Sequence, residues 1–284
     1  MAQFTNQAQL SYNGAVVNSN IAVGEVLEVL SASKTAVLDD YTRNDDVTYV
    51  ISVVNSGTLP VTGLTVTDDL GGYPFGETTV YPLAYVAGSV RTYLNGVLQS
   101  APAVAPGPPL VFSGITLPAG SNLMIIYEAD VTQFAPLDVG DSVINTATVT
   151  GTGIPNPVTV TETVTPEQVP ELTITKFIEP VPVTENGTLT YQFIIQNYGN
   201  TAAVATDNVA VSDTFDPILS NVTATLDGAP LVENTDYTYL PATGVFATVP
   251  GRITVPAATY TQDETTGAWI ITPGVTTLVV TGTV

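Results

Sequence analysis

The chain contains two long segments with the same pattern, and this internal repeat restricts its fold more than any other feature. SASKTAVLDDYTRNDDVTYVISVVNSG aligns without a gap with TITKFIEPVPVTENGTLTYQFIIQNYG. In both segments, polar and apolar residues alternate, which is typical of a β-strand with one buried face. A repeated β pattern of this length predicts two copies of one β domain.

Further segments with the same alternation lie between turns rich in Gly and Pro. They include LTVTDDL, LMIIYEADV and LTYQFIIQN, whereas no long segment has the apolar spacing of an amphipathic helix. Many short strands of this kind favour an all-β fold, here two tandem immunoglobulin-like β-sandwiches. A chain of 284 residues has room for two such domains, each with its own core.

The N-terminus resembles the strand that closes the first repeat. The first repeat ends in VINTATVTGTG, and the chain begins, after three residues, with FTNQAQLSYNG. Aligned on the asparagines, Asn6 falls on Asn145, and Ala8 and Leu10 fall on apolar positions. The second repeat stops at Val284, one strand short of the first. We therefore expect Phe4 to Gly14 to act as a donor strand that completes a second domain.

These matches predict the organisation of the chain. Residues 153–171 join the repeats and are rich in Pro, Thr and Glu, and residues 15–29 are their N-terminal equivalent. We expect each segment to form an extended or single-strand connector. The predicted parts are a donor strand at 1–14, a connector at 15–29, a sandwich at 30–152, a connector at 153–171 and an incomplete sandwich at 172–284.

The composition excludes several classes of function. The chain has no cysteine and no histidine, which removes disulfides, thiol nucleophiles and the usual general base. Its formal net charge of −21 argues against nucleic acid as a partner. No apolar segment is long enough to cross a membrane. We expect no cofactor and no metal, and we read the acidic cluster around Asp39, Asp40, Asp45 and Asp46 as a solvated loop rather than a calcium site.

The two lysines of the chain occupy the same position in each repeat. In a strand, residues two apart share a face, so Lys34 shares its face with Leu30, and Lys176 shares its face with Leu172. The same argument turns Asp68, Asp213 and Asn145 inward. We therefore expect Lys34, Asp68 and Asn145 to meet in the core of the first domain.

The repeats resemble a known family of conserved repeats, domain of unknown function eleven. The resemblance rests on SKTA and TITKF, VTYVISVVNSG and LTYQFIIQNYG, VTDDL and VSDTF, and NTATVTG. It implies a surface or spore-appendage protein of a Gram-positive bacterium. Related surface sandwiches form spontaneous Lys–Asn isopeptide bonds assisted by a buried acid, which would join Lys34 to Asn145 and, between subunits, Lys176 to Asn6.

The residue types fit that chemistry. Burial lowers the pKa of a lysine and raises that of an aspartate, so a neutral amine could attack an asparagine carboxamide that a protonated Asp polarises. Asp68 and Asp213 are the expected assisting acids, and Asp69 is a competing acid whose side chain we expect to point outward. The alternative is a buried Lys–Asp ion pair that forms no covalent bond.

The sequence favours a structural subunit that polymerises head to tail, with Phe4, Asn6, Ala8 and Leu10 of one chain entering the incomplete domain of the next. The alternative is a surface adhesin stalk or ligand-binding module that does not polymerise, and an enzyme is a more distant alternative. The expected partner is a second copy of the chain, with accessory anchoring proteins. The expected location is the cell or spore surface. The first residues lack a secretory-signal pattern, which favours assembly on a spore inside its mother cell, and a chain from which a leader had been removed would look the same.

Overall fold

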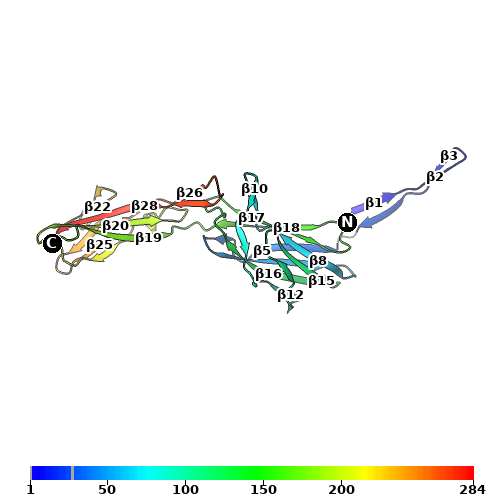
Figure 1. The fold of residues 1–284 in the computed structure, drawn as a ribbon, viewed down its shortest axis with the longest axis horizontal. Helices are drawn as coiled ribbons and strands as arrows, with labels where there is room; N and C mark the ends of the chain where they lie inside the picture. Colours follow the sequence, from blue (N-terminus) through cyan, green and yellow to red (C-terminus); the bar gives the residue numbers. More distant parts are fainter. Residues whose placement is uncertain (1, 27–28) are drawn as a thin grey trace. The chain divides into compact units, whose positions relative to one another are not determined.

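The computed structural model describes residues 2–26 and 29–284, and almost all regular structure in them is β-strand. A single 3₁₀ turn, Ala205–Asp207, is the only helical element in this part of the chain. The chain divides into two compact units (Figure 1). Unit 1 comprises Met1–Asp39, Asn44–Thr132 and Ile144–Val164, and unit 2 comprises Asp40–Arg43, Gln133–Val143 and Thr165–Val284. The all-β fold expected from the sequence is confirmed.

Unit 1 is a sandwich of two sheets. The strands of the first sheet follow the order β13 (Val97–Leu98), β12 (Arg91–Leu94), β16 (Ser121–Val131), β7 (Asp46–Asn55) and β5 (Leu30–Ala36), and β11 (Leu83–Tyr85) also pairs with β16. The second sheet has the order β14 (Ala103–Ala105), β15 (Leu110–Leu117), β8 (Val61–Asp68), β17 (Val143–Thr150) and β18 (Val158–Pro166). The short strands β9 (Tyr73–Phe75) and β10 (Thr78–Val80) pair with one another.

The core of unit 1 follows from the alternation in its strands. On β7, Tyr49, Ile51 and Val53 are fully buried, while the residues between them are half-buried. β16 pairs with β7 and buries Ile125 and Tyr127 in the same way. Such burial of large apolar side chains is the main stabilising contribution to a sandwich of this size.

Unit 2 repeats the first sheet of unit 1. Its strands follow the order β19 (Leu172–Glu179), β20 (Thr188–Asn197), β28 (Gly274–Thr283), β22 (Ser220–Leu226) and β23 (Ala229–Pro230). Lys34 of β5 lies opposite Ile51 of β7, and Lys176 of β19 lies opposite Phe193 of β20. The register of the two pairs therefore matches the sequence repeat.

The second sheet of unit 2 is smaller than its counterpart in unit 1. It has three strands in the order β21 (Ser212–Thr214), β25 (Val245–Thr248) and β24 (Tyr237–Leu240). A separate pair is formed by β26 (Thr259–Gln262) and β27 (Trp269–Thr272). β21 corresponds to β8, but no strand in the described part of unit 2 takes the position that β17 has in unit 1.

The N-terminal segment forms a hairpin rather than a lone donor strand followed by a connector. β1 (Ala2–Asn6) pairs with β4 (Ala22–Val26), and β2 (Gln9–Tyr12) pairs with β3 (Ala15–Asn18). Asn13 and Gly14 both have positive φ, as the two central residues of a tight hairpin turn require. Residues 4–23 are all exposed. The sequence analysis missed the turn formed by Asn13 and Gly14, and so it separated two segments that pair with one another.

The second connector also differs from its expected form. Residues 153–171 were expected to link two domains, but β18 is a strand of the unit 1 sheet beside β17. Thr165 and Pro166, at the end of β18, pair in parallel with β6 (Asp40–Tyr41), and these residues belong to unit 2. The boundary expected at residue 152 therefore lies further along the chain.

Among the described residues, no helix has the length and apolar character needed to cross a membrane. No group of three or more acidic side chains in the same residues is placed to hold a metal ion.

Candidate functional site: a buried lysine cluster and its open counterpart

Unit 1 brings together three of the residues selected from the sequence. Lys34 comes from β5, Asp68 from the end of β8 and Asn145 from β17. The Lys34 Nζ donates a hydrogen bond of 2.7 Å to the Asp68 Oδ2, and both side chains are wholly shielded from solvent. Burial lowers the pKa of Lys34, and the neighbouring Asp68 carboxylate only partly offsets that effect.

Tyr127 completes this cluster, and the sequence analysis did not identify it. Its hydroxyl donates a 2.6 Å hydrogen bond to the Asp68 Oδ2 and accepts a 3.3 Å bond from the Asn145 Nδ2. Burial raises the pKa of Tyr127 well above its usual value, so the phenol stays protonated and remains a donor. Tyr127 lies at an inward-facing position of β16, and this position was the signal in the sequence that could have identified it. The second repeat has no tyrosine at the matching position.

Aromatic rings form one wall of the cluster. The Tyr49 and Tyr127 rings stack with centroids 5.6 Å apart, and the Lys34 Nζ lies 4.8 Å from the centroid of the Tyr49 ring. The Asp68 Oδ1 accepts a 3.0 Å hydrogen bond from the Leu70 N–H. These contacts hold the amine and the carboxyl group in one place within the apolar core.

The carboxamide of Asn145 is incompletely bonded. Its Oδ1 is buried and has no hydrogen-bond partner among the described groups. An unsatisfied buried oxygen costs about 1–3 kcal/mol. The non-covalent arrangement therefore leaves the carboxamide less well stabilised than the lysine and the aspartate beside it.

Asp69 has a different role from Asp68. Its Oδ1 accepts hydrogen bonds from the backbone N–H groups of Gly71 and Thr146, at 2.9 Å and 2.8 Å. Asp69 thus holds the backbone of β17 beside β8, while Asp68 faces the lysine, as the strand parity predicted.

The cluster has the groups needed for amide formation. A neutral Lys34 amine could attack the Asn145 Cγ, so that an Nζ–Cγ bond forms and the Cγ–Nδ2 bond breaks. Asp68 could accept the proton that the amine loses and pass one to the departing nitrogen, which leaves as ammonia. The product replaces a buried charge with a neutral amide, a favourable change in an apolar core. The covalent bond itself stays a prediction.

Unit 2 contains the lysine and the aspartate of this cluster in a more open setting. Lys176 of β19 contacts Asp213 of β21, with the Nζ near the Oδ2, and the Nζ lies 4.5 Å from the centroid of the Tyr191 ring. The Lys176 side chain is 42% exposed and that of Asp213 is 18% exposed, against 0% for both partners in unit 1. Val280 stands opposite Tyr191 where Tyr127 stands opposite Tyr49.

The exposure has a clear structural cause. β8 pairs with β15 on one side and β17 on the other, whereas β21 pairs only with β25. Ile174 and Ile178, which share a face with Lys176, are 55% and 43% exposed. Leu172 and Lys176 were expected to face the core, but every residue of β19 is exposed, and in the described chain nothing covers this strand.

Asn6 lies in the N-terminal hairpin, where its partner across the two strands is Ala22. No asparagine in the described part of unit 2 takes the place that Asn145 has in unit 1. The predicted Asn6–Lys176 pair therefore requires Asn6 to be supplied to unit 2.

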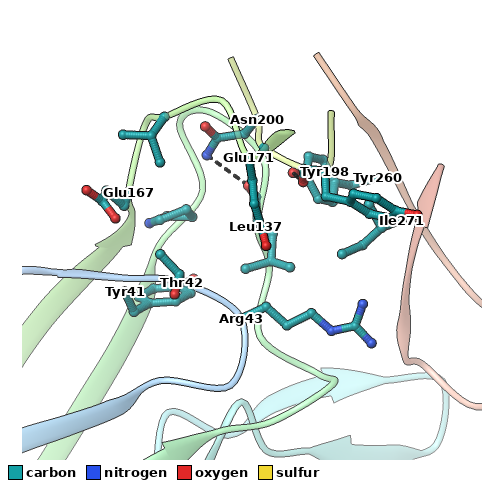
Figure 2. Close-up of a pocket in the computed structure, with 13 residues that line it drawn as sticks. Tyr41, Thr42, Arg43, Leu137, Glu167, Glu171, Tyr198, Asn200, Tyr260 and Ile271 are labelled. Atoms are coloured by element: carbon teal, nitrogen blue, oxygen red, sulfur yellow. Dashed lines mark hydrogen bonds between the residues drawn. The ribbon is translucent and has the colours of Figure 1, made fainter. Parts of the chain in front are cut away.

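A small pocket lies within unit 2. Its lining includes Tyr41, Leu137, Glu167, Asn200 and Tyr260 (Figure 2), and its volume is about 40 Å³. The Asn200 Nδ2 donates to the Leu137 carbonyl at 3.0 Å, and the Tyr260 hydroxyl donates to the Tyr198 carbonyl at 2.8 Å. Burial raises the pKa of Tyr260 to about 12. The space is about the size of a water molecule, so we do not assign it a ligand.

Comparisons with known proteins do not identify a family. No family model and no curated protein matches the chain. Among solved structures, BcpA, the major pilin subunit of Bacillus cereus, is 13% identical over 96% of this chain and 73% of its own, with a TM-score of 0.38. A C-terminal fragment of the major pilin GBS80 of Streptococcus agalactiae is 12% identical over 87% of this chain and 91% of its own, with a TM-score of 0.36.

The same comparison also finds a red sea bream transglutaminase, at 12% identity over 87% of this chain and 31% of its own, with a TM-score of 0.30. Since pilins and an enzyme are found at similar levels, these values are too low to relate the functions of the chains.

Proposed function

We propose that the protein is the structural subunit of a surface filament that polymerises head to tail by N-terminal strand donation. The observation that carries the proposal is the open position beside β21, which β17 fills in unit 1. An uncovered strand edge beside exposed apolar residues readily accepts another strand. The N-terminal segment has the sequence pattern of β17, including its asparagine.

Unit 1 supplies a template for the donated strand. There, Ala147 lies opposite Asp68 and Val149 lies opposite Val66. When the repeat alignment is used to apply this register to unit 2, Ala8 of the donated strand lies opposite Asp213 and Leu10 lies opposite Val211. Asn6 then faces the core of unit 2 on the side of Lys176, with Asp213 in the role of Asp68.

Geometry of the repeat favours donation between chains over donation within one chain. In unit 1 the closing strand precedes the segment that leads into the next repeat. The same order makes the N-terminal strand close a domain that precedes unit 1, and in the proposed filament that domain is unit 2 of another copy. Such a head-to-tail contact does not close on itself and produces an open filament.

In this proposal the only chemistry is self-modification. Lys34 joins Asn145 within a chain, and Lys176 joins Asn6 of the next chain, each with loss of ammonia. The protein is otherwise not an enzyme, its partners are further copies and accessory anchoring proteins, and it works outside the cell or on the spore surface.

Negative-stain microscopy of the purified protein tests the proposal. Wild-type protein is expected to form long fibres, and removal of residues 1–14 is expected to abolish them while unit 1 stays folded. Leu10→Glu is expected to block assembly because it puts a charge into the core of unit 2. Gln9→Glu is the matched control, since it alters the adjacent, outward-facing position.

Two results would contradict the proposal. Fibres formed normally by the truncated protein would show that another surface drives polymerisation. Single rods of wild-type protein under all conditions would favour a stalk that does not polymerise.

A further inference from the structure

In unit 1 the lysine cluster is covered by two strands rather than one. β17 lies between β8 and β18, and the loop 151–157 joins β17 to β18. Glu162 of β18 is among the charges that act on Lys34, and Val164 of the same strand is fully buried. The element that closes the site is therefore a hairpin.

The N-terminal hairpin has the same construction. Leu10 lies opposite Val17 and Asn6 lies opposite Ala22, so the strand with the asparagine is paired along its length with the segment that follows it. In unit 1 the hydroxyls of Thr146 and Thr161 lie 3.5 Å apart across β17 and β18. Each asparagine-bearing strand is thus paired with a strand that follows it in the chain: β17 with β18, and β1 with β4.

The side chains on the two strands of the N-terminal hairpin fit one another in size, which supports the hairpin as one structural unit. Phe4 lies opposite Gly24, and a Cβ added to Gly24 would lie 2.4 Å from the Phe4 Cζ. The ring therefore rests on the glycine. On β17 and β18, counting outward from the Thr146–Thr161 pair, the matching positions hold Val143 and Val164, both buried. The N-terminal hairpin has a phenylalanine and a glycine where β17 and β18 have two valines of intermediate size.

Unit 2 has space for the large side chain. When the pairing of β17 with β8 is transferred to the donated strand and β21, Phe4 lies beyond the end of β21, near Pro217 and the residues after it. An open cavity of about 450 Å³ lies there, lined in part by Ile218, Leu219 and Tyr239. Phe4 is 55% exposed in the hairpin, so its ring is free to enter such a cavity.

We propose that the N-terminal hairpin docks whole into unit 2 of another copy. β1 and β2 take the place of β17 beside β21, while β3 and β4 stay paired with them and take the place of β18. Phe4 fills the cavity beside Tyr239, and Asn6, Ala8 and Leu10 cover the core. This inference rests on the proposed function, but it differs from the insertion of a single released strand.

Covalent locking of the hairpin distinguishes the two modes of insertion. Thr5 and Val23 are opposite one another, both are exposed, and they lie on the face away from Phe4 and Asn6. Since the chain has no cysteine, Thr5→Cys combined with Val23→Cys allows no other disulfide within the chain, and oxidised protein that runs as a monomer on a non-reducing gel contains the intended one. Ser11→Cys with Val16→Cys is a second lock near the turn, and loss of free thiols confirms that each lock has closed.

Fibre formation by the oxidised variants is then compared with that by the same variants under reducing conditions. Equal assembly supports docking of the whole hairpin. Assembly only after reduction overturns the inference and leaves donation of a single strand. If neither the wild type nor the reduced variants assemble, the proposed function fails, and this inference fails with it.

Gly24→Val provides an independent measurement. The added side chain collides with the Phe4 ring in the hairpin, so assembly is expected to fall sharply even though residue 24 is not part of the donated strand. Unchanged assembly by Gly24→Val would contradict docking of the paired strands. Val23→Ala is the matched control on the opposite face of the same strand.

Discussion

Unit 1 and unit 2 contain the same lysine–aspartate pair at the same register, but only in unit 1 is the pair sealed from water. β17 and β18 shield Lys34 and Asp68 completely, whereas the Lys176 side chain remains 42% exposed. The strength and reactivity of such a pair depend on its burial rather than on its residue types. The proposed strand donation accounts for this difference, because it supplies the missing cover of the second site from the N-terminal hairpin of another copy.

The strongest test of this comparison is covalent bonding. Wild-type monomer is expected to be lighter than its sequence mass by one ammonia, because only unit 1 contains lysine, acid and asparagine together. Asn145→Ala is expected to have the full mass of its own sequence, while the Asn6→Ala monomer is still expected to be lighter than its own sequence mass by one ammonia. Intact-mass spectrometry measures both. A monomer of unmodified mass would leave only the ion-pair alternative for unit 1.

Loss of the lysine is expected to affect the two units differently. In the Asn145→Ala background, where Lys34 stays a free amine, Lys34→Ala leaves Asp68 buried without a cation, which costs about 3–5 kcal/mol of unfolding free energy. Lys176→Ala removes a partly exposed pair and costs about 0–1 kcal/mol in the free monomer. Trp269, the one tryptophan of the chain, reports on unit 2 in denaturant titrations, and limited proteolysis reports on unit 1. Equal losses in the two units would contradict the difference in burial.

Tyr127 provides a smaller and more specific test. Tyr127→Phe removes the hydroxyl that bonds both Asp68 and Asn145, and it is expected to cost about 1–3 kcal/mol and to slow bond formation. Val280→Tyr gives unit 2 the missing hydroxyl and is expected to raise the yield of cross-linked fibres. Time courses of the ammonia loss measure the first effect, and gels of boiled fibres measure the second. If the rate of ammonia loss is unchanged in Tyr127→Phe, Tyr127 contributes only packing to the cluster.

The pH dependence of stability gives the smallest effect. In Asn145→Ala, Lys34 stays a free amine with a lowered pKa, so above that pKa the unfolded chain binds more protons than the folded one. Raising the pH toward about 9.5 should therefore stabilise the folded state, by at most about 1.4 kcal/mol for each unit of pKa difference. The wild type, whose lysine is consumed, and Asn145→Ala with Lys34→Met should lack this rise. A rise in stability of the same size in all three proteins would show that another titrating group causes it.

The sequence predicted much of unit 1 because strand alternation determines which side chains face the core. Lys34, Asp68 and Asn145 were found together for that reason. Tyr127 was missed because its contacts depend on the pairing of β16 with β7, which the repeat does not encode: Val280 stands at the matching position.

The N-terminal pairing was missed for a different reason. Alternation identified Phe4 to Gly14 as a strand but did not specify its partner. That partner is selected by two residues, Asn13 and Gly14, whose positive φ turns the chain back on itself. A comparison of long repeats does not detect a local turn of this kind.

Cysteine trapping between separate chains tests the central claim most directly. The unit 1 register, in which Thr148 lies opposite Thr67, predicts that Gln9 of one chain lies opposite Ser212 of the next. Equal amounts of Gln9→Cys and Ser212→Cys protein are mixed, allowed to assemble and oxidised, and Thr238→Cys, two strands away in the sheet of Ser212, replaces Ser212→Cys as the control. We predict a disulfide that joins the two different chains for Ser212 and none for Thr238. Fibres that form without the Gln9–Ser212 disulfide, or that give equal amounts with Thr238, would contradict the account.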